Sequence, residues 1–407
     1  MRATVPQVAE SVRSEYRSHN GSVYSHHADR LQPDVSRDRW RSLRPGEPRL
    51  DDPVPAAGGE QPAAWTLSGG GQRAPGSGCT NGSHFGPAGG RDSDGRPRFD
   101  QQVKPGAYLW WYVDAISDDG QHALSIIAFV GSVFSPYYAW AFARQGEQVQ
   151  ADNHCAINVA LYGKGGRRWT MTERSKGHVT RGSDHFQIGP SSVSWQHDHL
   201  RIDIDEVCAP LPYRVKGTVR LYPSALTTFV TALDDRGLHR WGPIAPCARV
   251  EVDLAHPAAH WSGEGYFDSN EGDEPIHRPF QAWDWSRARM KDGSTSVLYD
   301  VRQTNGTERL IARRFSPTGD SEAFVAPAQA TALPKTFWRI QRSVRADPEM
   351  ATQVVQTLED GPFYTRSLLH TRLLGESVTA VHETLQPQRL TAVPVQLMLP
   401  WRMPRRP

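Results

Sequence analysis

Short apolar runs separated by turn-forming residues are the feature that most restricts what this chain can fold into. AYLWWYVDAI (107–116) and HALSIIAFVG (122–131) stand on either side of Asp118-Asp119-Gly120. SVLYDVRQ (296–303) and TERLIARRF (307–315) stand on either side of a Thr-Asn-Gly turn. Pairs such as Asp-Gly and Asn-Gly favour the tight turns of β-hairpins, because glycine adopts positive φ without steric cost. These runs therefore predict antiparallel strands joined by hairpins.

Strand periodicity also dominates over helical periodicity elsewhere in the chain. In LRIDIDEV, Leu200, Ile202 and Ile204 would share one face of a strand, with charged residues on the other. No run of about ten residues or more has the 3.6-residue period of an amphipathic helix. The sequence therefore predicts an all-β protein of mainly antiparallel strands, whose sheets close into barrels or stack as sandwiches to hide their edges.

A repeated aromatic pattern bears on the number of domains. The same spacing of two aromatic residues and a following turn occurs at Trp110, Tyr112 and Asp119-Gly120 and again at Trp283, Trp285 and Asp292-Gly293. Two related β-barrels would produce such a repeat, and so would chance, because aromatic residues favour strands. With 407 residues, the chain is long enough for two domains.

The N-terminal part of the chain differs in composition from the rest. Residues 1–98 hold 10 Pro and 14 Gly and few paired apolar residues, so they cannot bury enough surface to offset the entropy lost on ordering. We therefore expect a disordered extension over 1–98, a first β domain over 99–255, a second β domain over 256–390 and a basic tail over 391–407.

Charge and hydropathy exclude several classes of partner and location. The chain has 46 Lys plus Arg against 44 Asp plus Glu, so no basic field favours nucleic acid. No stretch of about 18 apolar residues could span a bilayer as a helix. The first 20 residues contain no apolar signal sequence, so we expect a cytoplasmic protein. The four cysteines have no close spacing, which argues against a zinc knuckle or a disulfide framework.

The segment from Leu238 to Asp268 contains the strongest candidate site. Side chains two apart on a strand point the same way, so His239 and Trp241 would share one face. Tyr266 and Asp268 would share another. A carboxyl among aromatic walls loses solvation, which raises its pKa and keeps a proton available near neutral pH. This set suits acid chemistry on an apolar substrate, with aromatic faces to stabilise a carbocation, although such residues are also ordinary near turns of β proteins.

Other motifs argue against common reaction classes. His197 and His199 would project from one face of a strand as metal ligands do, but no third ligand follows at a telling spacing, and a polar hairpin turn is the better interpretation. No GxSxG elbow, P-loop or GxGxxG followed by a helix is present, which disfavours serine hydrolysis, ATP use and dinucleotide binding. We expect neither a metal nor a cofactor. The tail VQLMLPWRMPRRP (395–407) suits either a lipid interface or a solvated chain end.

Several long strings carry a resemblance to a known family. They are PGAYLWWYVDAISDDG (105–120), IIAFVGSVFSPYYAWA (126–141), NHCAINVALYG (153–163), RWTMTER (168–174), HRWGPIAP (239–246) and GEGYFDSNEGDEPI (263–276). Over roughly residues 99–390, the sequence resembles the carotenoid 1,2-hydratases of purple photosynthetic bacteria, also called hydroxyneurosporene synthases. The resemblance implies two lipocalin-like antiparallel β-barrels in tandem.

The same resemblance implies a reaction and its residues. Members of the family add water across the terminal C1=C2 bond of acyclic carotenoids such as neurosporene and lycopene, giving 1-hydroxy carotenoids without a cofactor. Protonation at C2 places the cation on the tertiary C1, where water captures it. The resemblance implies that Asp268 is the proton donor and that His239 orients the acid or the water. Trp241 and Tyr266 would form the wall and stabilise the cation.

The implied substrate bears on partners and location, because a long polyene dissolves in the bilayer. The enzyme would dock on the inner, photosynthetic membrane as a peripheral protein, or take its substrate from a neighbouring enzyme of the carotenoid pathway. The chief alternative is a non-catalytic carrier of carotenoid or lipid, since lipocalin-like barrels also bind apolar ligands without changing them. A β-sandwich adhesin is disfavoured by the missing signal sequence.

Overall fold

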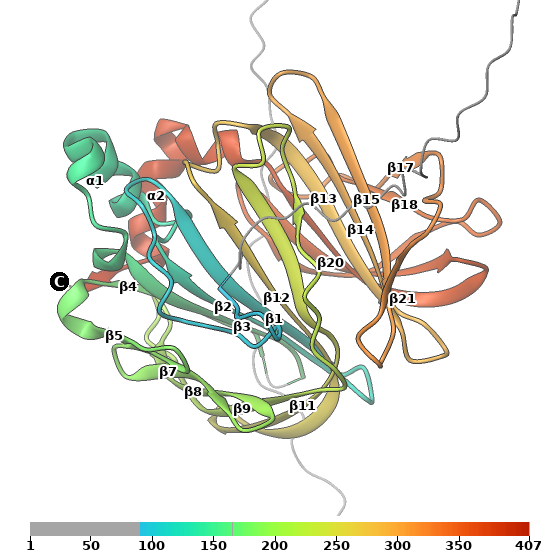
Figure 1. Cartoon of the computed structure of the whole chain (residues 1–407), viewed down its shortest axis with the longest axis horizontal. Coiled ribbons are helices and arrows are strands. Elements are labelled where there is room, and N and C mark those ends of the chain that lie inside the picture. The colour runs from blue at the N-terminus through green and yellow to red at the C-terminus, as the bar shows by residue number, and fades with distance from the viewer. Residues whose placement is uncertain (1–89, 165, 407) are drawn as a thin grey trace, which may run out of the picture. The chain divides into compact units, whose positions relative to one another are not determined.

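Two large β-sheets form the framework of the protein in the computed structural model, which describes residues 90–164 and 166–406 (Figure 1). Within these residues the first sheet has 13 strands, in the order β22-β4-β3-β2-β1-β12-β11-β9-β8-β7-β6-β5, with β10 paired to β11. Its strands are β1 (Tyr108–Ser117), β2 (His122–Val130), β3 (Cys155–Gly163), β4 (Arg168–Arg174), β5 (Val179–Arg181), β6 (His185–Ile188), β7 (Ser191–Gln196), β8 (His199–Val207), β9 (Arg214–Pro223), β10 (Thr231–Ala232), β11 (His239–His256), β12 (Ala258–Gly272) and β22 (Arg405–Arg406).

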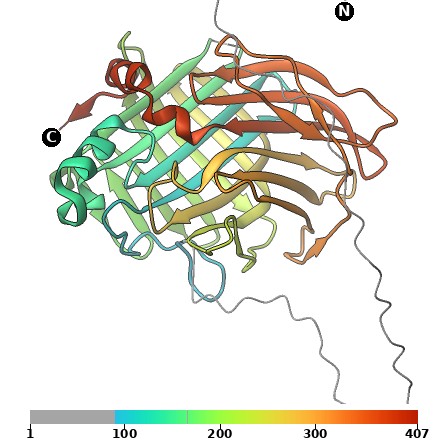
Figure 2. The same cartoon turned by 90° about the horizontal axis from the view of Figure 1, so that it is seen from above.

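The second sheet lies against the first, and the strands of the two sheets run in different directions (Figure 2). Its order over the described residues is β16-β15-β14-β13-β21-β20-β19. Its strands are β13 (Phe280–Arg289), β14 (Thr295–Gln303), β15 (Glu308–Phe315), β16 (Ser321–Ala323), β19 (Gln353–Asp360), β20 (Tyr364–Leu373) and β21 (Glu376–Leu385). A separate pair of short strands is formed by β17 (Ala330–Ala332) and β18 (Ser343–Arg345).

The predicted strands and hairpins are confirmed. The runs 107–116 and 122–131 form the antiparallel hairpin β1–β2. The pair around the Thr-Asn-Gly turn forms β14–β15, and Gly306 has a φ of 87°, which a glycine adopts without strain. The run 200–207 lies in β8, and His197 occupies the turn between β7 and β8 with a φ of 51°. The interpretation of the histidine-containing run as a polar turn is therefore correct.

Two α-helices in the described part of the chain were not predicted: α1 (Pro136–Gln145) and α2 (Val393–Arg402). Ser135 caps α1, since its hydroxyl oxygen accepts a hydrogen bond from the backbone N–H of Tyr137 at 3.2 Å. Aromatic residues dominate the sequence PYYAWAFARQ, so the helix has no clear polar stripe to mark its period. The 3₁₀ helices of the described residues are η1 (Gly146–Gln148), η2 (Ala151–Asn153), η3 (Lys176–His178) and η4 (Pro387–Thr391).

Strand β1 is buried on both faces, and its alternate side chains enter two different cores. Leu109, Trp111 and Val113 pack in the core of the first sheet. Trp110 and Tyr112 pack in a second core, which side chains of the second sheet complete. Since successive side chains of a strand point to opposite faces, an apolar residue is needed at nearly every position of such a strand. This double burial explains the almost uninterrupted apolar run.

The fold is all-β and lipocalin-like, and the first sheet curls as half a barrel (Figure 1). Two tandem barrels are not confirmed. The strand β12 pairs with both β1 and β11, so residues 258–272 belong to the first sheet although the second predicted domain begins at 256. The segment 391–407 holds α2 and the short strand β22, which pairs with β4. The division into domains itself stays a prediction.

Part of the predicted disordered extension belongs to the fold. Residues 1–89 lie outside the described residues, but Arg91 is buried. Its guanidinium donates hydrogen bonds to the carbonyl oxygen of Pro243 at 2.9 Å and to Oγ of Ser269 at 3.1 Å. A buried cation that satisfies backbone carbonyls fixes the chain to the sheet. The expectation of disorder is therefore wrong for residues 90–98.

Candidate active site

A cavity of about 60 Å³ lies between the two sheets. Strands β1, β2 and β12 of the first sheet and the segment between β2 and α1 line one side, and strands β13, β14, β20 and β21 of the second sheet line the other. Most of the wall is aromatic, and it includes the carboxyl-bearing residues Asp268 and Glu383. The lining residues are Trp110, Tyr112, Ile127, Phe134, Asp268, Asn270, Trp283, Trp285, Tyr299, Tyr364, Glu383 and Leu385.

Asp268, the predicted acid, is buried in this wall with only 3% of its surface exposed. Its Oδ2 accepts hydrogen bonds from Nε1 of Trp241 and from Oη of Tyr266, both at 2.8 Å. Its Oδ1 has no hydrogen-bond partner among the described residues. An oxygen that already accepts two hydrogen bonds is a poor place for a proton, so Oδ1 is the atom that carries it in the neutral acid.

The surroundings of Asp268 suit a carboxyl that holds and releases a proton near neutral pH. Burial raises the pKa of Asp268 to about 7, while the hydrogen bonds from Trp241 and Tyr266 act to lower this pKa. The two donors also stabilise the carboxylate that remains after the proton has left. Such an arrangement suits a general acid in an apolar site, and the catalytic role of Asp268 stays a prediction.

Strand register explains why three of the four predicted residues meet. In the β11–β12 ladder, Pro243 lies opposite Asp268, and Trp241 lies opposite Asn270. Tyr266 stands two residues before Asp268 on β12, so both side chains point to the same face. The ladder is irregular between Pro243 and Ala248, and such bulges reorient side chains beside functional sites.

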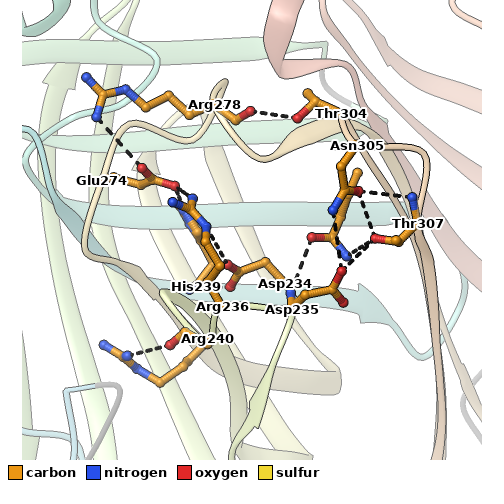
Figure 3. Close-up of polar contacts among 12 residues, drawn as sticks. Asp234, Asp235, Arg236, His239, Arg240, Glu274, Arg278, Thr304, Asn305 and Thr307 are labelled. Atoms are coloured by element: carbon orange, nitrogen blue, oxygen red, sulfur yellow. Dashed lines mark hydrogen bonds and ion pairs between the residues drawn. The ribbon is translucent and has the colours of Figure 1, made fainter.

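His239 lies in the same region but makes different contacts. Its Nδ1 is 2.9 Å from Oη of Tyr108, and its Nε2 is 3.7 Å from Oε1 of Glu274. Figure 3 shows Glu274 within reach of both His239 and Arg278. Burial lowers the pKa of His239 to about 4, so the imidazole is neutral at neutral pH. No hydrogen bond joins His239 to Asp268 in the described part of the chain, and its role in orienting the acid stays a prediction.

The second carboxyl of the cavity, that of Glu383, was not predicted from the sequence. Its Oε1 lies 2.7 Å from Oη of Tyr112 and accepts a hydrogen bond from Nη1 of Arg366. Burial raises the pKa of Glu383, whereas the charge of Arg366 and the hydrogen bond from Tyr112 act to lower it. Glu383 lies on β21, so nothing close to Asp268 in the sequence could have indicated it.

A further buried carboxylate, Asp114, connects Glu383 to a second guanidinium. Its Oδ2 is 2.8 Å from Oη of Tyr112 and 3.2 Å from Nη2 of Arg366, and its Oδ1 accepts a hydrogen bond from Nε of Arg287 at 2.6 Å. Burial raises the pKa of Asp114, but the two guanidiniums outweigh this effect and hold it below its usual range. One signal was available, because Asp114 interrupts an apolar strand and a buried charge requires partners.

A second cavity, of about 100 Å³, adjoins the first. Ile127, Phe134 and Tyr364 line both cavities. Leu399 and Arg402 of α2 also line the second cavity. The two cavities therefore share part of their walls, and together their linings extend from α2 to Asp268.

Candidate metal ligands and nucleophiles are few. Among residues 90–164 and 166–406, no group of three or more His, Cys, Asp or Glu side chains is placed to hold a metal ion. Cys155 and Cys247 are buried free thiols, and burial raises the pKa of each, which makes them poor nucleophiles. The expectation that the reaction needs neither a metal nor a cofactor stays a prediction.

Fold and site together define a class: an all-β, lipocalin-like protein with a protonatable carboxyl in an aromatic cavity. A crystal structure from Nitrosomonas europaea that carries the description AttH has a similar fold, with a TM-score of 0.50 at 15% sequence identity. The match covers 70% of this chain and 93% of that chain. At this level of identity the likeness concerns the fold alone.

Sequence comparisons narrow the class to a family. The family described as Carotenoid hydratase CrtC matches residues 126–407. The acyclic carotenoid 1,2-hydratase of Rubrivivax gelatinosus is 54% identical over 376 residues, which cover 92% of each chain. The protein of the same name from Thiocapsa roseopersicina is 50% identical over 381 residues, or 93% of each chain. This chain therefore belongs to the carotenoid hydratase family, as the resemblance predicted, and it is a hydro-lyase.

Proposed function

We propose that this protein hydrates the terminal C1=C2 bond of acyclic carotenoids such as neurosporene and lycopene, giving 1-hydroxy carotenoids without a cofactor. The observation that carries the proposal is the buried carboxyl of Asp268, whose pKa is about 7, in the wall of an aromatic cavity. The relatives named acyclic carotenoid 1,2-hydratase support the substrate class. A carrier would need no such carboxyl.

The reaction begins when the proton on Oδ1 of Asp268 moves to C2 of the alkene. The electron pair of the double bond forms the new C2–H bond and leaves a positive charge on the tertiary C1. Trp241 and Tyr266 already donate to Oδ2, so the negative charge that develops on Asp268 meets hydrogen bonds that are in place before the reaction. We therefore propose that Trp241 and Tyr266 support the proton donor Asp268 and do not form the wall that stabilises the cation.

The cation at C1 is stabilised by the aromatic residues that line the cavity. Trp110 and Tyr112 of β1 line the cavity together with Trp283 and Trp285 of the second sheet. An aromatic face contributes about 2 kcal/mol or more to a cation when water is largely excluded. Water then attacks C1 and loses a proton to give the tertiary alcohol.

Conversion of lycopene by the purified protein tests the proposal. Mass spectrometry would detect the gain of one water, and water labelled with ¹⁸O would show that the hydroxyl comes from solvent. We expect Asp268→Asn to bind lycopene but to lose hydration by a factor of about 10² to 10⁴. Full turnover by this variant would remove Asp268 as the acid, and a wild-type protein that binds lycopene without converting it would favour the carrier.

We also propose that α2 brings the protein to the surface of the inner, photosynthetic membrane. Leu397 and Trp401 are 63% and 75% exposed, whereas Leu399 is buried and lines the second cavity. Apolar side chains on an exposed helix seat it in a lipid interface, and Arg402 places a cation beside them. The described residues contain no helix that is long and apolar enough to cross a membrane.

Flotation with liposomes that contain anionic lipid tests the membrane proposal. We expect the wild-type protein to float with the lipid and the double variant Leu397→Ser/Trp401→Ser to float less. Equal recovery of the wild-type protein in the soluble fraction with and without liposomes would contradict it. In that case, delivery by a neighbouring enzyme of the carotenoid pathway would remain as the source of substrate.

A further inference from the structure

Hydration requires two proton transfers, and the proposed function accounts for one of them. Asp268 supplies the proton that reaches C2, but the water that attacks C1 must lose a proton to another group. Glu383 lines the same cavity from the second sheet, and its side chain is 14% exposed. It is therefore within the space that the substrate and the attacking water would share.

Burial raises the pKa of Glu383, and its direct partners act against this effect. The guanidinium of Arg366 is fully buried and contacts Oε1 of Glu383, which favours the ionised carboxylate. Tyr112 holds the same oxygen from β1 at 2.7 Å. Arg287 pairs with Asp114 at 2.6 Å, so Arg366 is not the only cation that neutralises Asp114 and Glu383. The carboxylate form of Glu383 would thus have a direct cationic partner rather than be left unpaired in the cavity wall.

We propose that Glu383 is the general base of the hydration. This inference rests on the proposed function, because a base is needed only if Asp268 first protonates the alkene. A lone pair of the water oxygen forms the new O–C1 bond, one O–H bond of that water breaks, and its proton passes to the Glu383 carboxylate. Glu383 then holds the proton equivalent that Asp268 has lost, and one proton passing between the two carboxyls through their shared cavity restores the starting state.

Deuterium exchange separates the two proton transfers. In D₂O, Asp268 adds a deuteron to C2, and after rotation about the single bonds at C2 of the cation the original C2–H bond can break instead of the new C2–D bond. Its proton returns to Asp268, the C1=C2 bond forms again, and the recovered lycopene carries deuterium without a second carboxyl. The experiment measures hydration of lycopene and deuterium in the recovered lycopene for wild type, Glu383→Gln and Asp268→Asn. Glu206→Gln is the matched control, since Glu206 forms a buried pair with Arg174 at 3.0 Å and does not line the cavity.

We expect Glu383→Gln to lose hydration by a factor of at least about 100 while it exchanges deuterium at the wild-type rate. Asp268→Asn should lose both activities, and Glu206→Gln should keep both. Wild-type hydration by Glu383→Gln would overturn the proposal. Loss of exchange together with hydration would also overturn it, because Glu383 would then serve the protonation step. A wild-type protein that neither hydrates nor exchanges would instead contradict the proposed function.

The conservative variant Glu383→Asp covers the case in which Glu383→Gln does not fold. This variant keeps a carboxylate as the partner of Arg366. Its shorter side chain moves that carboxylate away from the attacking water. We expect it to exchange deuterium at the wild-type rate and to hydrate at a rate between those of wild type and Glu383→Gln. An equal loss of both activities in Glu383→Asp would overturn the base role.

Discussion

Asp268 and Glu383 line the same cavity, but each sheet gives its carboxyl a different kind of partner. Asp268, on the first sheet, accepts hydrogen bonds from the neutral donors Trp241 and Tyr266. Glu383, on the second sheet, contacts the guanidinium of Arg366. Burial raises the pKa of both groups, but only Glu383 contacts a cation directly. The comparison teaches that burial acts alike on the two carboxyls and that the direct partner sets them apart, since neutral donors surround Asp268 and a guanidinium favours the ionised form of Glu383.

Removing the cation from the second sheet should have the largest effect on stability. Arg366→Met leaves Glu383 without its cationic partner and Asp114 with Arg287 alone, and breaking a buried ion pair from one side costs about 3–5 kcal/mol. Urea unfolding measures the change in the free energy of unfolding. The control is Arg249→Met, whose exposed pair with Asp118 should contribute less than about 1 kcal/mol. Equal losses in the two variants would show that the Arg366 network does not behave as a buried one.

The free energy of unfolding should depend on pH because Asp268, unlike an exposed aspartate, titrates near neutral pH in the folded protein. Its pKa is about 7 in the folded protein, against about 3.9 for an unfolded aspartate, so the folded state binds more protons between these values. The contribution of Asp268 to stability therefore falls as pH rises from about 4 to about 7, and the loss is complete above this range.

Asp268→Asn removes this titration, so the variant should become more stable relative to wild type on going from pH 5 to pH 8. Urea unfolding of both proteins at the two pH values measures the difference. A difference that does not change with pH would mean that Asp268 does not titrate in this range.

Removing one neutral donor should have a smaller effect. Trp241→Phe keeps the aromatic ring but deletes one hydrogen bond to Oδ2 of Asp268, at a cost of about 1–3 kcal/mol. Because the lost bond favoured the ionised form, the pKa of Asp268 should rise, and the decline of kcat/KM at high pH should move to higher pH. The control is Tyr108→Phe, since Tyr108 bonds His239 and not Asp268, and its pH profile should not move. A shift of equal size in both variants would contradict the assignment of Trp241 to the acid.

The helices and the sheet boundary show what local sequence patterns leave undetermined. The α1 segment carries a Ser-Pro start signal, but aromatic residues hide its period. Strand β12 joins the first sheet because it pairs with β1, which comes much earlier in the chain. No local pattern in the sequence of β12 reveals this partner. Arg91 is a further example. The segment around it is rich in Pro and Gly and suggested disorder, whereas the hydrogen-bond partners of Arg91 lie on strands that are distant in the sequence.

The sequence by itself determined the strands, the hairpins, the family and the proximity of Tyr266 and Asp268. These follow from alternation and turn chemistry, which act between neighbours along the chain. Only the tertiary structure decided that Glu383 shares the cavity with Asp268, that Trp241 donates to the acid and that Arg366 reaches Asp114. Proton affinity in a buried site depends on lost solvation and on charges within a few ångströms, and both are supplied here by strands that are far apart in the sequence.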